Sequence, residues 1–77
     1  MNAISLRNGL CLIAGNLTWY KDGIIHREDG PAIIYTSGRK EWLQNGFLHR
    51  EGGPAIESES GSKFWILNGK YHMFLLN

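Results

Sequence analysis

The stretch that decides the fold is WYKDGIIHREDGPAI at residues 19–33, because it returns as WLQNGFLHREGGPAI at residues 42–56. A third copy begins at residue 65 and reads WILNGKYHMFLLN. Trp, Gly and His recur at intervals of 23 residues, a period typical of arrays whose units bury apolar surface by stacking on their neighbours. The recurring positions that we interpret as structural are Gly23, Gly46, Gly69, His26, His49, His72, Pro31 and Pro54.

Each copy contains a dipeptide that favours a two-residue hairpin turn. Asp22-Gly23, Asn45-Gly46 and Asn68-Gly69 suit type I′ turns, in which both central residues need positive φ. Aromatic and branched residues flank each dipeptide, as expected of strands. The Gly-Pro and Ser-Gly pairs between the hairpins indicate loops or strand entries. The sequence therefore predicts an all-β fold, an antiparallel meander of repeated β-hairpins in a single twisted sheet.

The chain of 77 residues fits one domain. We expect repeats at about residues 17–38, 39–61 and 62–77, the last one partial, preceded by a half-repeat at about residues 9–16. A shift by one period aligns Gly15 with Gly38, so the chain enters the array in the second half of a unit. Residues 4–8 could form a short helical turn or a frayed strand.

Counting outward from a two-residue turn predicts which residues face each other across a hairpin. The predicted pairs are Trp19–His26, Tyr20–Ile25, Thr18–Arg27, Trp42–His49, Glu41–Arg50, Trp65–His72 and Ile66–Tyr71. With these pairs, both faces of the sheet are substantially apolar. Because a large exposed apolar patch usually marks an interface, we expect a homodimer.

Composition excludes several classes of protein. Cys11 is the one cysteine, which excludes an internal disulfide and a multi-cysteine metal site. The net charge of +1 without a basic run argues against nucleic-acid binding. The longest apolar stretch, residues 10–14, is too short to span a membrane. With a free cysteine and no recognisable signal peptide, we expect a cytoplasmic protein without a cofactor.

The Trp, the Asn/Asp-Gly turn and the His three residues after that Gly, repeated every 23 residues, resemble MORN repeats. The form W-x-x-N-G-x-x-H-R-E-x-G-P-A is more similar to a MORN-like variant of phage and large-virus proteins. MORN units usually have Gly directly after the His, where this chain has Arg27 and Arg50. The resemblance covers residues 17–72 and implies an elongated, often dimeric hairpin scaffold. Resemblance to the viral variants implies action on a host component.

The three histidines could be zinc ligands or structural residues. Equivalent positions in a hairpin array lie about 9–10 Å apart, two strand spacings. Zinc–nitrogen bonds are about 2.1 Å, so the histidines cannot share one ion, and we expect no metal site. We interpret each imidazole as packed on its cross-strand Trp, with one ring nitrogen bonded to the following turn.

The arginines and aromatic residues are the best candidates for a ligand or partner site. Arg27 and Arg50 could bind a phosphate or carboxylate bidentately, or pair with nearby glutamates such as Glu28, Glu41 and Glu51. The tryptophans could form a stacking platform, a partner hot spot or core. The candidate binding residues are Trp19, Trp42, Trp65, Tyr20, Arg27 and Arg50.

We identify no catalytic residues, since no nucleophile–base set is specific enough to name. The leading hypothesis is a non-enzymatic binding module of a virus or phage. It would act in the host cytoplasm and bind or sequester a host protein through an aromatic sheet face. The alternatives are a dimeric sponge for a small nucleotide-type ligand and a structural piece of a larger assembly.

Overall fold

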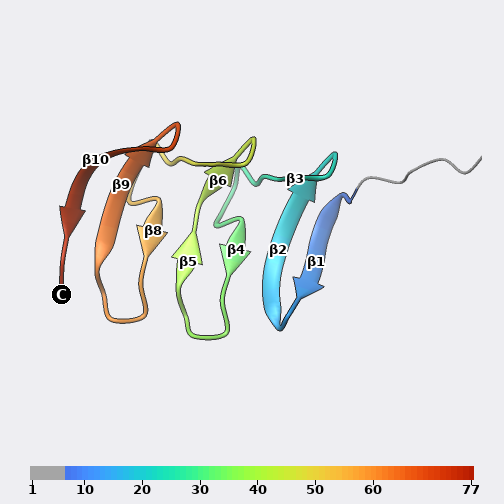
Figure 1. Ribbon diagram of the computed structural model, residues 1–77, viewed down its shortest axis with the longest axis horizontal. Helices are drawn as coiled ribbons and strands as arrows, with labels where there is room; N and C mark the ends of the chain where they lie inside the picture. Colours follow the sequence, from blue (N-terminus) through green and yellow to red (C-terminus); the bar gives the residue numbers. More distant parts are fainter. Residues whose placement is uncertain (1–6) are drawn as a thin grey trace, which may run out of the picture.

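The computed structural model describes residues 7–77, which form an antiparallel β array (Figure 1). The strands are β1 Gly9–Ile13, β2 Asn16–Lys21, β3 Ile24–Ile25, β4 Ile33–Ile34, β5 Lys40–Glu41, β6 Leu43–Gln44, β7 Phe47–Leu48, β8 Ile56–Glu57, β9 Lys63–Leu67 and β10 Lys70–Leu75. The described residues contain no helix, and the predicted all-β meander is confirmed. The alternatives for residues 4–8 lie mostly outside the described part, and residues 7 and 8 belong to no strand.

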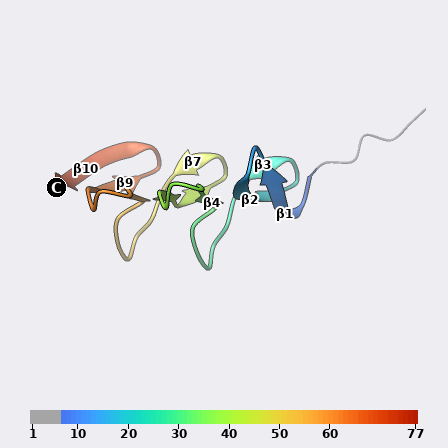
Figure 2. The ribbon, with the colours of Figure 1, turned by 90° about the horizontal axis from the view of Figure 1, so that it is seen from below.

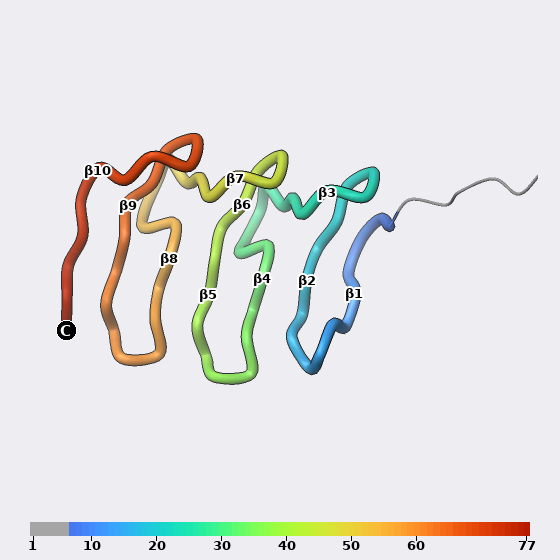
Figure 3. The backbone as a smooth tube through the Cα atoms, viewed as in Figure 1, coloured from blue at the N-terminus to red at the C-terminus, as the bar shows by residue number. Residues whose placement is uncertain are grey.

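The main sheet follows the order β1-β2-β4-β5-β8-β9-β10, with β3 paired to β2, and every neighbouring pair is antiparallel. The tube in Figure 3 follows the same path, with a hairpin at one end of each unit. The prediction of a single sheet was wrong, because β6 and β7 form a separate two-stranded sheet. Trp42 lies between β5 and β6 and joins the two sheets by donating its N–H to Ala55 and accepting from His49.

The three predicted hairpins are confirmed, and their turns have the expected backbone. Asn45 and Gly46 have φ of 52° and 82°, and the Asp22-Gly23 and Asn68-Gly69 turns are similar. A fourth tight turn at Ala14-Gly15 joins β1 to β2, with φ of 50° and 83°. The aligned Gly38 also has positive φ, 98°, but it lies in a longer connection between β4 and β5.

The predicted register holds close to each turn and fails further out. Tyr20 pairs with Ile25 and Ile66 with Tyr71, as predicted. His26 and His49 each donate their backbone N–H to the carbonyl of the predicted tryptophan, at 3.0 and 2.9 Å. The wrong predictions were the pairs Thr18–Arg27, Glu41–Arg50 and Trp65–His72.

Each of these failures has a local cause. After the histidine the chain leaves its own hairpin, so Arg27 N–H bonds the carbonyl of Leu43 and Arg50 N–H that of Ile66, both in the next unit. Thr18 is thereby free to pair with Ile33 of β4. In the third hairpin, the register shifts at a bulge between Tyr71 and Met73, and Trp65 pairs with Met73 in place of His72.

The core is small and follows the middle of the sheet. The buried apolar residues among those described are Ala32, Leu43, Ala55, Ile56 and Ile66. In the view from below, the hairpin ends lie on one side of the sheet, and the segments from β3 to β4 and from β7 to β8 lie on the other (Figure 2). Few side chains are fully buried. Hydrogen bonds and side-chain contacts between units therefore contribute much of the stability of this array.

Candidate functional site

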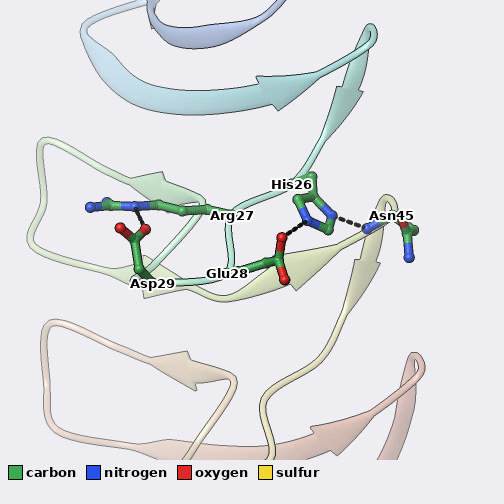
Figure 4. Close-up of polar contacts among 5 residues, drawn as sticks. All are labelled: His26, Arg27, Glu28, Asp29 and Asn45. Atoms are coloured by element: carbon green, nitrogen blue, oxygen red, sulfur yellow. Dashed lines mark hydrogen bonds and ion pairs between the residues drawn. The ribbon is translucent and has the colours of Figure 1, made fainter.

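Each of the first two histidines links its own unit to the turn of the next. His26 Nδ1 accepts a hydrogen bond from Asn45 N–H at 2.9 Å (Figure 4). His49 Nδ1 accepts from Asn68 N–H at 3.0 Å. The bond to the following turn that we predicted for these two histidines is therefore present. A nitrogen that accepts from a backbone N–H must hold a lone pair, which assigns the proton of the neutral ring to Nε2.

The other nitrogen of each ring faces a carboxylate. His49 Nε2 lies 3.3 Å from Glu51 Oε2, within hydrogen-bonding distance. His26 Nε2 lies 3.5 Å from Glu28 Oε2 and is buried without a hydrogen bond. From the sequence, Glu28 and Glu51 were possible partners of the arginines. In the structure they contact the histidines.

Arg27 and Arg50 lie over the tryptophan rings of their own units. The guanidinium carbon is 3.9 Å from the ring centroid of Trp19 for Arg27 and 4.0 Å from that of Trp42 for Arg50. At this distance, a guanidinium is attracted to the negative face of the ring. Each arginine covers an apolar surface that the sequence had suggested as an open platform.

Proline carbonyls and carboxylates hold the two guanidinium groups in place. Nη1 of each arginine donates to the carbonyl of the proline four residues later, at 3.1 Å in both units. Arg27 Nε also donates to Asp29 at 3.0 Å (Figure 4). Arg50 Nη1 lies 3.5 Å from Glu57.

The glycine before each of these prolines makes room for the arginine. A Cβ at Gly30 or Gly53 would lie 2.9 Å from the guanidinium carbon of Arg27 or Arg50. Neither glycine has positive φ, so space and not backbone conformation explains the glycine. In the recurring HRE-x-GP sequence, the glycine and the proline carbonyl thus hold the arginine over the tryptophan ring.

A groove of about 460 Å³ lies between the loops that follow the first two hairpins. Residues 27–30 line one wall, residues 49–52 the other, and Trp42 and Gln44 lie between them. The arginines in the groove are mostly covered, with 25% and 32% of their side chains exposed. The carboxylates of Glu28, Asp29 and Glu51 are 76%, 87% and 83% exposed, so the accessible charge at the rim is negative.

The remaining candidate residues lie outside this groove. Trp65 is half-buried and has Met73 opposite it, where the first two units place an arginine over the ring. Tyr20 lies beneath Arg7, with 5.5 Å between the guanidinium carbon and the ring centroid. His72 is exposed at the bulge of β10.

The first hairpin is held by contacts that we did not predict from the sequence. Asn8 Oδ1 accepts from Asp22 N–H at 2.9 Å, and the Arg7 carbonyl accepts from Gly23 N–H at 2.8 Å. These contacts repeat those that His26 and the Ile25 carbonyl make to the next turn. Asn8 therefore does for the first hairpin what histidine does for the later ones. The Asn-Gly pair before the first apolar run was the available signal.

A second polar cluster links β4 to β5. Arg39 Nε donates to Glu41 at 2.7 Å, and the Tyr35 hydroxyl donates to the same carboxylate at 3.1 Å. Burial, followed by the neighbouring negative charge, raises the pKa of Tyr35 above its ordinary 10.0. Glu41 therefore bonds Arg39 and Tyr35, and not the predicted partner Arg50.

Comparisons of the chain with protein-family models, with curated proteins and with solved structures gave no match. Within residues 7–77, no group of three or more His, Cys, Asp or Glu side chains is arranged to hold a metal ion. No helix in the described part of the chain is long and apolar enough to cross a membrane.

Proposed function

We propose that this chain is a non-enzymatic protein-binding module whose groove between the first two loops holds an extended segment of a partner protein. The observation that carries the proposal is the groove itself, which has an aromatic residue between two walls of charged side chains. Its volume of about 460 Å³ is within the range of small binding sites. A groove of this size takes a few side chains of a partner.

The charge of the rim indicates the chemistry of the partner. The arginines are engaged with tryptophan rings and proline carbonyls, whereas Glu28, Asp29 and Glu51 are largely exposed. A partner segment with lysine or arginine side chains complements this rim, and such complementarity mainly affects specificity and association rate. The proposed partner is therefore a protein with a basic segment.

The resemblance extends the proposal to the class of protein and the compartment. The Trp, the Asn/Asp-Gly turn and the His at fixed spacing support a MORN-like variant of the phage and large-virus type. We accordingly propose a host protein as the partner and the host cytoplasm as the place of action. The hypotheses of a nucleotide sponge and of a structural assembly piece receive less support. The exposed carboxylates of the rim repel phosphate, and no feature of the groove favours a purely structural role.

The test is affinity capture from host lysate with matched variants. The groove variant Glu28→Lys/Glu51→Lys reverses the charge of two exposed rim residues. The control Glu59→Lys/Thr36→Lys/Leu12→Lys makes the same change in net charge at exposed residues outside the groove lining. We expect the native protein and the control to capture the same protein, and the groove variant to lose it. Equal capture by all three proteins would refute the groove as the binding site.

A further inference from the structure

We propose that the free edge of β10 is a self-association site, at which a second copy of this chain adds its own β10 in antiparallel orientation. β10 forms one end of the strand order of the main sheet and pairs with β9 alone among the described strands. Alternate backbone groups of such a strand point away from its neighbour and are free to bond another strand.

The side chains of this edge are exposed and apolar. The exposed large residues are Tyr71 at 63%, Met73 at 54%, Phe74 at 62%, Leu75 at 58% and Leu76 at 65%. Edge strands normally carry charges, proline or a short length that prevent pairing with other chains. Residues 71–76 contain no Asp, Glu, Lys, Arg or Pro.

The bulge at His72 increases the apolar surface on one face. It places Tyr71 opposite Ile66 and Phe74 opposite Phe64, so that both rings lie on the face of β9 that carries these two residues. Phe64 contacts both rings, at centroid distances of 6.1 Å and 6.4 Å. The aromatic cluster of Phe64, Tyr71 and Phe74 ends at the open edge, where a second copy would extend it.

A second copy fits this edge better than other occupants, because the edge is complementary to itself. Two copies related by a two-fold axis pair their β10 strands antiparallel, which continues the antiparallel order of the whole sheet. The lone charge of the strand, Lys70, then faces the apolar end of the other copy near Leu76, and the two lysines lie far apart. No like charges meet in this arrangement.

The exposed apolar area is close to what a weak dimer needs. The five exposed residues present roughly 500 Å² per copy, from side chains of about 150–250 Å² each. Covering all of this area on both copies would bury at most roughly 1,000 Å², which is near the lower limit of specific interfaces. We therefore expect a dimer that dissociates on dilution.

The other edge strand, β1, is a weaker candidate. It has two exposed large apolar residues, Leu10 at 54% and Leu12 at 70%. Residues 71–76 have five. β1 is also shorter, with five residues against six.

The test is light scattering after size exclusion over a range of concentrations, with two double variants of equal charge. Met73→Glu/Leu75→Glu places charge on the edge of β10, and the new carboxylate at residue 75 lies opposite Lys63 of its own chain, which supports the monomer fold. The control, Leu12→Glu/Phe47→Glu, changes residues that are 70% and 60% exposed on β1 and β7. Circular dichroism checks the fold of each variant.

We expect the native protein and the control to approach twice the 8.7 kDa chain mass as concentration rises, and the β10 variant to remain at 8.7 kDa. A native protein that stays monomeric overturns the proposal. A native dimer also overturns the proposal in three cases: if only the control variant is monomeric, if both variants are monomeric, or if both variants remain dimeric. As a readout independent of these variants, Met73→Cys in a Cys11→Ser background should give a covalent dimer with a short bis-maleimide. The failure of cross-linking in a sample that scatters as a dimer would place the contact elsewhere.

This proposal and the proposed groove fail separately. The groove lies between the first two loops, and none of its lining residues belongs to β10. Capture of a partner by the β10 variant would leave the groove proposal intact whatever the mass measurement shows.

Discussion

Replacing Gly53 with alanine would place a methyl group against the guanidinium of Arg50, because the new Cβ would lie 2.9 Å from Cζ and Nη1. The arginine would have to shift from its present position over the ring of Trp42, 4.0 Å from the centroid. The neighbouring Gly52 is a matched control, since its Cβ would meet nothing within 4 Å. Neither glycine has positive φ, so alanine suits both backbones.

The expected loss follows from the contacts that the arginine gives up. A partly exposed cation–π contact contributes about 0.5–1 kcal/mol. The hydrogen bond from Arg50 to the Pro54 carbonyl contributes about 0.5–1.5 kcal/mol. The ion pair with Glu57, at 3.5 Å and partly exposed, adds little. We therefore expect Gly53→Ala to be about 1–2.5 kcal/mol less stable than Gly52→Ala, with the effect of alanine on the unfolded chain judged from the same pair of substitutions in an Arg50→Ala background.

Urea denaturation monitored by tryptophan fluorescence measures this difference in unfolding free energy. The same two substitutions in an Arg50→Ala background should differ by less than about 0.5 kcal/mol, because the contact is already absent. Gly30→Ala should reproduce the loss in the first unit, where the Cβ would lie 2.9 Å from Arg27 Cζ. If Gly53→Ala and Gly52→Ala are equally stable with Arg50 in place, the stack contributes nothing and the reasoning is refuted.

Three further predictions concern hydrogen bonds elsewhere in the array. His49→Ala removes the acceptor of the Asn68 N–H, and its loss of about 0.5–1.5 kcal/mol should appear as faster amide exchange at the third turn; unchanged exchange would contradict it. Asn8→Ala should speed exchange of the Asp22 amide and leave the third turn unaffected, whereas a uniform loss of protection would argue against a local role. Because burial raises the pKa of Tyr35 in the folded state, the unfolded chain releases this proton first. The tyrosine's contribution is thus fully present below its ordinary value of 10.0 and falls as pH rises toward the folded pKa. Urea titrations should show this decline in the native protein relative to Tyr35→Phe, and parallel profiles would contradict it.

The sequence was sufficient to predict the hairpins because their determinants are local. The Asn-Gly and Asp-Gly pairs need positive φ at two consecutive residues, and the structure has 52° and 82° at Asn45 and Gly46. The pairs next to each turn follow from that geometry, as for Tyr20 and Ile25. The 23-residue period then predicts that the contacts of one unit return in the next.

The path of the chain after each histidine could not be predicted in the same way. Counting outward from the turn assumes that both strands continue, but Arg27 bonds the carbonyl of Leu43 in the following unit. A hydrogen bond between units depends on how hairpins stack, which pairing rules within one hairpin do not describe. The bulge at His72 is a similar case, since the third copy lacks the HRE-x-GP loop and β10 continues along β9.

The candidate residues were identified by type, but their arrangement required the structure. The arginines and tryptophans stand out by recurrence, yet the sequence alone did not indicate that each guanidinium lies on a ring of its own unit. Gly30 and Gly53 were interpreted only as turn residues, although they leave room for the arginine.

The most direct test of the account is whether the histidines hold successive units together. A ¹⁵N-labelled sample allows detection of scalar coupling across the hydrogen bond from the Asn45 amide to His26 Nδ1, and from the Asn68 amide to His49 Nδ1. We expect both couplings, with Nδ1 of each ring accepting the backbone N–H. Rings that carry the proton on Nδ1, and no coupling at either turn, would contradict the account.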